Sequence, residues 1–151
     1  MFFRQLLHDD LGCASYLIGS RSEAAIVDPK WEIDEYLAIA ADQHLRIEHV
    51  LETHNHADHL SGRGRLLAAT GATAYISAEA GVEYEHVPLR DGDVVAVGDV
   101  RMRALATPGH RPEHMAFLVS DAERADGPWL LLSGDSLFVG DSARPDLAVE
   151  A

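Results

Sequence analysis

Three imidazoles and one carboxylate occupy six consecutive positions, in residues 54–59 (HNHADH). Imidazole and carboxylate groups are preferred ligands of zinc, iron and related divalent ions. The alternating spacing allows His54 and His56 to converge on one point while Asp58 and His59 face a second. Solvated loop histidines are the simpler explanation, but a chance match at all four positions is on the order of one in a few hundred. The segment therefore predicts a metal site with two candidate positions.

Two more residues of ligand type each follow a predicted strand. His110 ends the turn Thr107-Pro108-Gly109-His110, and Asp135 ends Ser133-Gly134-Asp135. Alone, either would more often be a turn residue than a ligand. Beside the histidine-rich segment, a ligand role is favoured for both, because strand ends commonly deliver the side chains of one site.

Short apolar runs and turn residues predict the elements that must position these groups. Strands are expected over 2–7, 15–18, 24–27, 47–51, 73–76, 85–88, 94–97, 100–106, 115–119 and 129–132, the first three as an antiparallel meander. Helices are expected over 33–44 and 63–69. Residues 53–62 then form a loop from strand to helix, where sites are usually built. The pattern indicates an α/β (α+β) layered fold in which nothing marks a domain boundary.

The composition narrows the classes of partner. The 151 residues carry 25 acidic and 12 basic side chains, and Lys30 is the single lysine, so neither nucleic acid nor an anionic membrane surface is expected as a partner. No apolar run approaches the roughly 20 residues of a membrane helix, and the first residues do not resemble a signal peptide. The single cysteine, Cys13, fits a reducing compartment and is interpreted as a buried apolar residue. We expect a cytoplasmic protein.

These residues resemble the metallo-β-lactamase superfamily, whose HxHxDH loop, later histidine and bridging aspartate match residues 54–59, His110 and Asp135. Within it the chain is most similar to the persulfide dioxygenase branch, especially the forms fused to rhodanese domains. The segments that carry this similarity are 52–59 (ETHNHADH), 107–114 (TPGHRPEH), 134–141 (GDSLFVGD) and 144–147 (RPDL). Arg111 and Ala143 depart from the branch, which usually has threonine and glycine there. The resemblance implies an αββα sandwich.

Length is the larger departure from the family. Its domains normally continue for several dozen residues beyond the RPDL segment, through a second αβ layer. We therefore expect residues 1–151 to form one metallo-β-lactamase-like domain that is incomplete at its C-terminus, with most of the C-terminal αβ layer missing. A sheet left uncovered in this way favours a homo-oligomer that covers it.

The resemblance also implies a cofactor and a reaction. In the persulfide dioxygenase branch one Fe(II) would be held by His54, His110 and Asp135, a two-histidine, one-carboxylate set that leaves positions for substrate and O₂. The substrate would be glutathione persulfide or a similar small persulfide, oxidised to sulfite, and a rhodanese domain or partner would accompany the enzyme. His56 would then lie around the ligands, with Asp58 and His59 as catalytic residues that orient iron-bound water.

Two other functions remain open from the sequence. Zinc, as one or two ions, is the alternative to iron, and a dinuclear zinc thioester hydrolase of the glyoxalase II (hydroxyacylglutathione hydrolase) type would use two. The two ions would be bound directly by His54, His56, Asp58, His59, His110 and Asp135. A truncated, inactive metal-binding fragment is the third possibility. A hydrogen bond from His114 to a ligand or to a backbone group is left open, whereas His8, His44, His49 and His86 are expected to be solvated.

Overall fold

The first half of the chain builds a six-stranded sheet in the computed structural model, which describes residues 1–8, 13–124 and 126–144. Its strands follow the order of the sequence: β1 (Phe2–Leu7), β2 (Ala14–Ser20), β3 (Glu23–Val27), β4 (Arg46–Leu51), β5 (Thr73–Ser77) and β6 (Val87–Leu89). The first three are antiparallel, as the predicted meander requires, and β3 to β6 are parallel.

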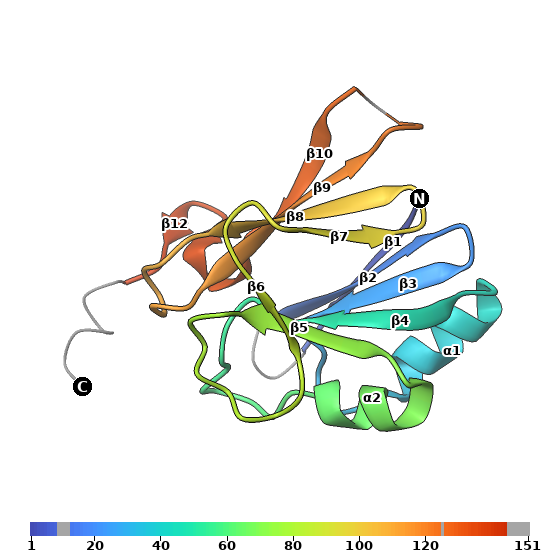
Figure 1. Ribbon diagram of the computed structural model, residues 1–151, viewed down its shortest axis with the longest axis horizontal. Coiled ribbons are helices and arrows are strands. Elements are labelled where there is room, and N and C mark those ends of the chain that lie inside the picture. The colour runs from blue at the N-terminus through green and yellow to red at the C-terminus, as the bar shows by residue number, and fades with distance from the viewer. Residues whose placement is uncertain (9–12, 125, 145–151) are drawn as a thin grey trace.

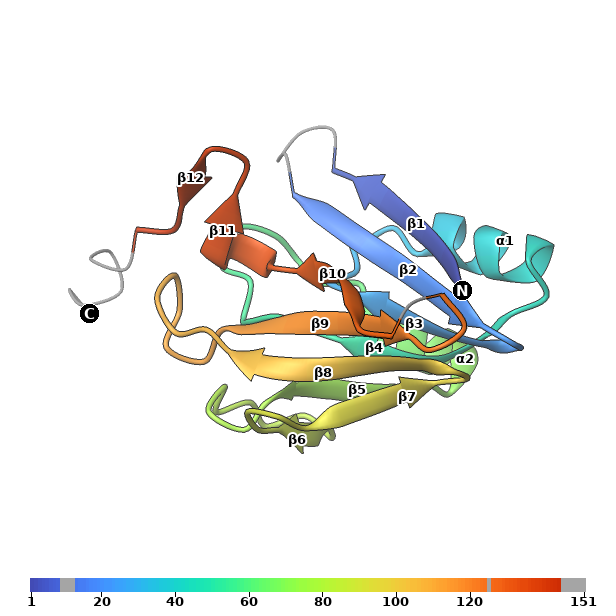
Figure 2. The same cartoon turned by 90° about the horizontal axis from the view of Figure 1, so that it is seen from above.

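The second half builds a four-stranded antiparallel sheet in the order β10-β9-β8-β7. The strands are β7 (Val94–Val97), β8 (Val100–Ala106), β9 (Met115–Asp121) and β10 (Pro128–Leu132). A short 3-10 helix, η1 (Gly134–Ser136), follows β10 and leads into a small hairpin of β11 (Leu137–Phe138) and β12 (Asp141–Ser142). Figure 2 shows this hairpin projecting beyond one end of the two sheets.

Apolar side chains between the two sheets form the main core. Ile18 and Val27 of the first sheet and Met102 and Phe117 of the second are fully buried there. The helices α1 (Asp34–Asp42) and α2 (Arg63–Thr70) cover the opposite face of the first sheet (Figure 1). A second core lies beneath them, because a helix with one apolar face must bury it against another element.

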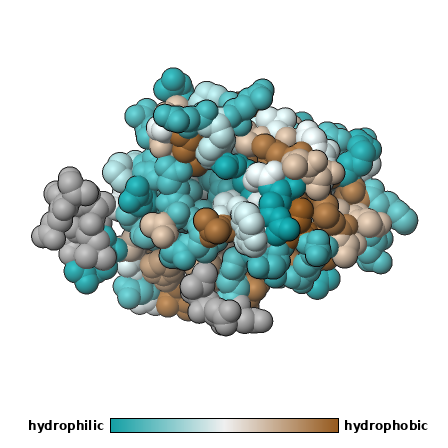
Figure 3. Space-filling model, turned by 90° about the horizontal axis from the view of Figure 1, so that it is seen from below, coloured by the Kyte–Doolittle hydropathy of each residue, from teal (hydrophilic) through white to brown (hydrophobic). Residues whose placement is uncertain are grey.

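The described layers are thus helix, sheet and sheet. In the described part of the chain both α-helices pack on the six-stranded sheet, and β10 leaves Trp129 and Leu131 38% and 44% exposed. The fourth layer of an αββα sandwich is not among the described residues. The face that carries the helices is mainly hydrophilic with separate hydrophobic patches (Figure 3). None of the described helices has the length and apolar character needed to cross a bilayer.

The structure confirms the ten expected strands and both helices, with shifts at their ends. β6 runs from Val87 to Leu89 rather than over 85–88. Helix α1 ends two residues early, at Asp42, because His44 takes a left-handed conformation with φ of 54° that a helix cannot continue through. Residues 145–147 of the RPDL segment lie outside the described residues.

Parallel pairing brings several loops to one edge of the sheets. Val27 at the end of β3 lies opposite Leu51 at the end of β4, so the residues that follow the two strands are neighbours. The second sheet joins this edge through Met115 at the start of β9, whose backbone N–H donates to the carbonyl of Thr53 at 2.8 Å. Loops from both sheets therefore meet at one place.

Candidate metal centre

Three of the predicted ligands come together at this edge. His54 follows β4, His110 follows β8, and Asp135 lies in η1. A ring nitrogen of each histidine and a carboxylate oxygen of the aspartate all lie within 4.8 Å of one another. Oδ2 of Asp135 is 3.8 Å from Nε2 of His54 and 3.6 Å from Nε2 of His110. His110 and Asp135 follow His54 by 56 and 81 positions in the sequence. The fold therefore brings three distant residues to a common point.

The separations fit a shared cation better than direct hydrogen bonds. Both exceed the usual hydrogen-bond range, which ends at about 3.2 Å. Two bonds of roughly 2.1 Å that meet at roughly 90–110° place their ligand atoms about 3.0–3.5 Å apart. Two imidazoles and one carboxylate are also a donor set that iron and zinc accept. A small inward movement of these side chains would suffice to hold a divalent ion.

Hydrogen bonds orient the His54 ring so that its Nε2 faces the other ligands. Its Nδ1 lies 2.9 Å from Oγ1 of Thr53, and that hydroxyl donates to Oδ2 of Asp28 at 2.8 Å. Since the hydroxyl proton is committed to Asp28, Nδ1 of His54 must donate, which leaves Nε2 as the acceptor. Burial, with the nearby His56 charge, lowers the pKa of His54 to about 3. The ring is therefore neutral, as a ligand must be.

His114 holds the segment that carries Asp135. Its ring is 1% exposed, its Nδ1 lies 2.8 Å from Oγ1 of Thr107, and its Nε2 accepts the backbone N–H of Asp135 at 3.1 Å. Gly134 makes this approach possible, since a Cβ there would lie 2.6 Å from Nε2 of His114. The sequence leaves open what His114 contacts. In the structure it contacts the backbone of Asp135, a predicted ligand.

His56 does not converge with His54, contrary to the expectation from their spacing. The two ring centroids are 4.2 Å apart, but Nε2 of His56 lies 3.1 Å from Oδ1 of Asp28 and 3.1 Å from Oε2 of Glu52. Burial alone lowers the pKa of His56, but the hydrogen bonds and charges of the two carboxylates outweigh it and raise the pKa to about 10. In this arrangement His56 is a cation paired with acids.

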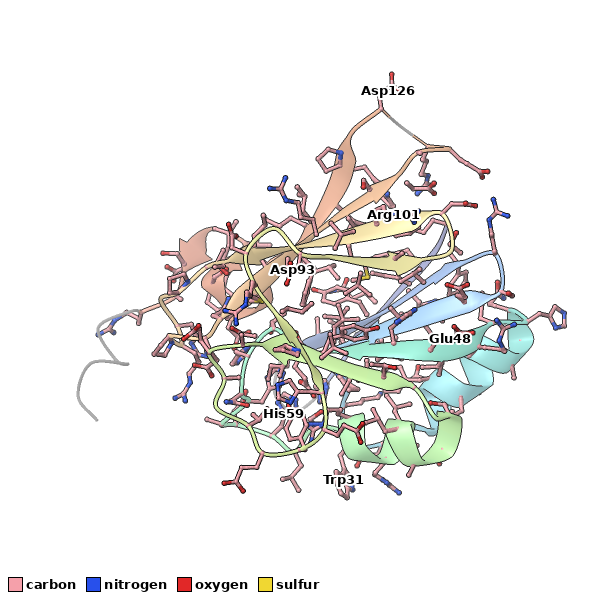
Figure 4. All side chains as sticks on the ribbon, viewed as in Figure 1. Trp31, Glu48, His59, Asp93, Arg101 and Asp126 are labelled. Atoms are coloured by element: carbon pink, nitrogen blue, oxygen red, sulfur yellow. The ribbon has the colours of Figure 1, made fainter. Side chains whose placement is uncertain are left out.

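Asp58 and His59 form a separate group with Cys13. Nδ1 of His59 is 3.1 Å from Oδ1 of Asp58, and the thiol of Cys13 donates to Oδ2 of Asp58 at 3.4 Å. Burial and the hydrogen bond to Asp58 raise the pKa of Cys13 to about 11. Figure 4 shows His59 among the loops near the end of β4, away from Glu48 farther back on that strand. His8, expected to be solvated, packs beside His59 with ring centroids 5.1 Å apart.

A hollow of about 320 Å³ opens beside these groups. Its lining includes residues from β2 and just before it, from the loop after β4, from η1 and from the β11–β12 hairpin: Cys13, Tyr16, His56, His59, Asp135 and Phe138. The hollow combines carboxylate, imidazole and thiol groups on one side with apolar side chains of the hairpin on the other. It offers a route for a small molecule to the side of the site occupied by Asp135.

Sequence reasoning missed the acids that hold the centre in place. Asp28 directly follows the predicted strand 24–27 and has no predicted role, and Glu52 is only the first residue of the family segment 52–59. The pairing of Val27 with Leu51 brings both acids to one edge, but only a correct strand order reveals it. Asp28 also has φ of 49°, a left-handed conformation that aspartate tolerates better than most residues. The sequence does offer one signal for Asp28 and Glu52, because each acid directly follows a buried strand.

The family profile of the metallo-beta-lactamase superfamily matches residues 8–150. The chain belongs to this superfamily. The chain carries the HxHxDH loop, the later histidine and the aspartate of this superfamily. Of these residues, the fold gathers His54, His110 and Asp135 at one point. These residues lie in loops and in η1 at one edge of two stacked sheets.

Similar proteins within the superfamily carry different names. Hydroxyacylglutathione hydrolase of Francisella tularensis subsp. novicida (strain U112) is 33% identical over 136 residues, which cover 89% of this chain and 51% of that protein. The crystal structure of a metallo-beta-lactamase from Staphylococcus aureus subsp. aureus COL matches with a TM-score of 0.91 and 38% identity, covering 98% of this chain and 47% of that one. ETHE1 from Myxococcus xanthus matches with a TM-score of 0.87 and 35% identity, covering 98% and 63%. The chain spans about half the length of the curated relatives it matches.

Proposed function

We propose that this metallo-β-lactamase-fold protein is a persulfide dioxygenase, which uses one non-haem iron to oxidise glutathione persulfide or a similar small persulfide. His54, His110 and Asp135 would hold the iron. The resemblance of residues 52–59, 107–114 and 134–141 to the persulfide dioxygenase branch supports this proposal, and so does the likeness to ETHE1.

The orientation of His56 is the observation that carries the proposal. A dinuclear site of the expected kind needs His56 as a ligand beside His54, but Nε2 of His56 is engaged by Asp28 and Glu52. Releasing it would leave two buried acids, 6% and 3% exposed, without their cation. Because unpaired buried charges are costly, a three-residue site is favoured over a six-residue one.

The reaction balances as one persulfide, one O₂ and one water giving one thiol, one sulfite and two protons. Bound iron would supply the positions at which the terminal sulfur and O₂ are brought together. The residues of the chain would hold the iron ligands in position. Thr53 and Asp28 fix the ring of His54, while His114 and Gly134 fix the backbone of Asp135. The hollow lined by Cys13, Tyr16 and Phe138 would admit the persulfide.

Thioester hydrolysis is the second candidate, and the 33% identity with hydroxyacylglutathione hydrolase favours it. A second metal of a hydrolase would need Asp58 and His59 as ligands. His59 lines the same hollow as Asp135, and its ring centroid lies 4.4 Å from that of His56. This reaction would need His56 to leave its acids when two ions bind.

Metal-specific product analysis separates the two reactions. Metal-free protein would be loaded with one equivalent of Fe(II) under anaerobic conditions, or with two equivalents of zinc, and each form given glutathione persulfide with O₂ and, separately, a glutathione thioester. We expect the iron form to produce one sulfite for each O₂ consumed, and the zinc form to leave the thioester intact. Thioester cleavage by the zinc form without sulfite from the iron form would refute the proposal.

A further inference from the structure

A second hollow, of about 370 Å³, has no part in the proposed function. It lies among the end of β5, the end of β6 and the loop between β8 and β9. None of its lining residues lines the hollow beside Asp135. Much of its lining is apolar: Leu89, Ala106, Pro108, Pro112 and Met115. The volume and the apolar lining suit a small organic molecule better than a bare ion.

Glu113 supplies an independent reason to infer a ligand in this hollow. Its side chain is 5% exposed, yet it is among the lining residues. Oε1 accepts the backbone N–H of Asn55 at 3.2 Å and Nε–H of Arg111 at 3.3 Å. No described residue donates a hydrogen bond to the other oxygen, Oε2. Because buried carboxylate oxygens are normally paired, Oε2 is a free acceptor for a ligand in the hollow.

The charges around the hollow favour a cationic ligand. Glu79 and Asp91, both exposed, line it together with Glu113, whereas Arg90 is the single cation among its lining residues. Three carboxylates against one guanidinium give the hollow a negative potential. These three acids do not form one of the groups, among the described residues, whose ligand atoms converge as a metal ion requires. An organic cation therefore fits the hollow better than a metal ion.

We propose that this hollow binds a primary alkylammonium group. The ammonium nitrogen donates to Oε2 of Glu113, and the alkyl chain lies against the buried side chains of Leu89 and Met115. An ammonium has three donors and no acceptor, which matches a carboxylate oxygen without a donor, and its charge strengthens the hydrogen bond. The group belongs either to a free amine or to a lysine side chain of another protein, since both present the same chemistry.

Titration with n-butylammonium, followed by NMR of the backbone amides, tests the site. We expect saturable binding with the largest shifts in residues 77–79, 89–91 and 113–115, and at least tenfold weaker binding by Glu113→Gln. Glu123→Gln is the matched control, because it removes the same charge from an exposed position between β9 and β10. It should bind like the unmodified chain. n-Butanol, which has nearly the same shape without the charge, should bind at least tenfold more weakly.

A second variant keeps the test valid if Glu113→Gln disturbs its own loop. Ala106 is exposed and lines the hollow, so Ala106→Leu fills part of the space and leaves Glu113 unchanged. We expect it to weaken n-butylammonium binding at least tenfold without moving the midpoint of urea unfolding. Absence of saturation, equal affinities of Glu113→Gln and Glu123→Gln, or unchanged binding by Ala106→Leu would overturn the proposal.

A peptide distinguishes the two sources of the ammonium group. A capped glycyl-lysyl-glycine peptide that binds at least tenfold more tightly than n-butylammonium would assign the hollow to a lysine of another protein. Equal or weaker binding of the peptide would assign it to free amines. Chelator in every sample prevents a bond between the amine and a metal. Since no readout depends on iron or on persulfide oxidation, the proposed function can fail or hold separately.

Discussion

Three neighbouring imidazoles acquire three different chemical roles from their hydrogen-bond partners. His54 is neutral and presents Nε2 to the centre because Thr53 takes its other nitrogen. His56 is a cation between Asp28 and Glu52. His59 keeps one nitrogen on Asp58 and the other unpaired among the described residues. The residue type alone could not distinguish these roles, since all three belong to one six-residue motif.

The first prediction concerns iron retention. Replacing His110 by alanine removes one of three ligands, so we expect His110→Ala to bind less than a tenth of the Fe(II) bound by the unmodified chain. The measurement is elemental analysis after anaerobic loading and desalting. His44→Asn is the control, because His44 is exposed and its left-handed backbone suits asparagine. Equal retention by both variants would disprove the ligand role of His110.

The second prediction concerns the dependence of stability on pH. The pKa of His56 is about 10 in the folded chain against an ordinary value of 6.5. Its ion pairs therefore stabilise the fold fully below pH 6.5, and this contribution is lost as the pH rises toward 10. His54, whose pKa is lowered, has the opposite effect on stability, and that effect is confined to pH values below 6.5.

Urea unfolding of the metal-free chain and of His56→Gln tests this sign. The loss of unfolding free energy in the variant should be largest near pH 6 and should shrink steadily toward about pH 9.5. A loss that grows with pH would show that His56 is not held as a cation. Chelator in every sample keeps bound metal from contributing to the difference.

At the scale of elements, the sequence predicts the strands well and the site only in part. Alternating burial in β8, where Val100, Met102 and Ala104 point inward, reflects a period that can be seen in the sequence. The role of Asp28 depends instead on β3 lying parallel to β4, a long-range pairing that local patterns do not encode. The sequence located His54, His110 and Asp135, but the acids that hold His54 and His56 could be found only from the topology.

The turn into η1 gives the third prediction. Gly134 has φ of 51°, and an added Cβ would lie 2.6 Å from Nε2 of His114 and 2.8 Å from Oγ1 of Thr53. Gly71 has φ of 72° but open space around it. Gly71→Ala should therefore cost only the backbone strain of about 1–2 kcal/mol. Gly134→Ala should cost at least about 2–3 kcal/mol, because a steric clash is added.

Both variants can be compared by urea unfolding and by competition for Fe(II) with a chelator. We expect Gly134→Ala alone to weaken iron binding, since the displaced backbone carries Asp135. Equal losses of stability, with unchanged iron affinity in both variants, would show that the close approach at Gly134 does not matter to the site.

The link from β9 to η1 gives the fourth prediction. His114→Phe keeps an aromatic ring beside His54 but removes the acceptor of the Asp135 N–H and the contact with Thr107. Changes of this kind around a ligand typically weaken metal binding 10–100-fold. We expect at least a tenfold loss of Fe(II) affinity in the chelator competition. Unchanged affinity would leave His114 with a packing role only.

At the scale of the whole molecule, the centre joins two sheets that are otherwise held by their apolar core. His54 comes from the first sheet, and His110 and Asp135 come from loops of the second. The bond from Met115 to Thr53 fixes the edges together where these ligands meet. The expected homo-oligomer and rhodanese partner stay predictions.

X-ray absorption at the iron edge tests the central claim most directly. The chain would carry less than one equivalent of Fe(II), so that the iron occupies the position that binds it most tightly. The account predicts a first shell of nitrogen and oxygen with two imidazoles and no sulfur, from His54, His110 and Asp135. A sulfur neighbour, which only Cys13 can provide from among these clustered residues, or a single imidazole, would contradict it.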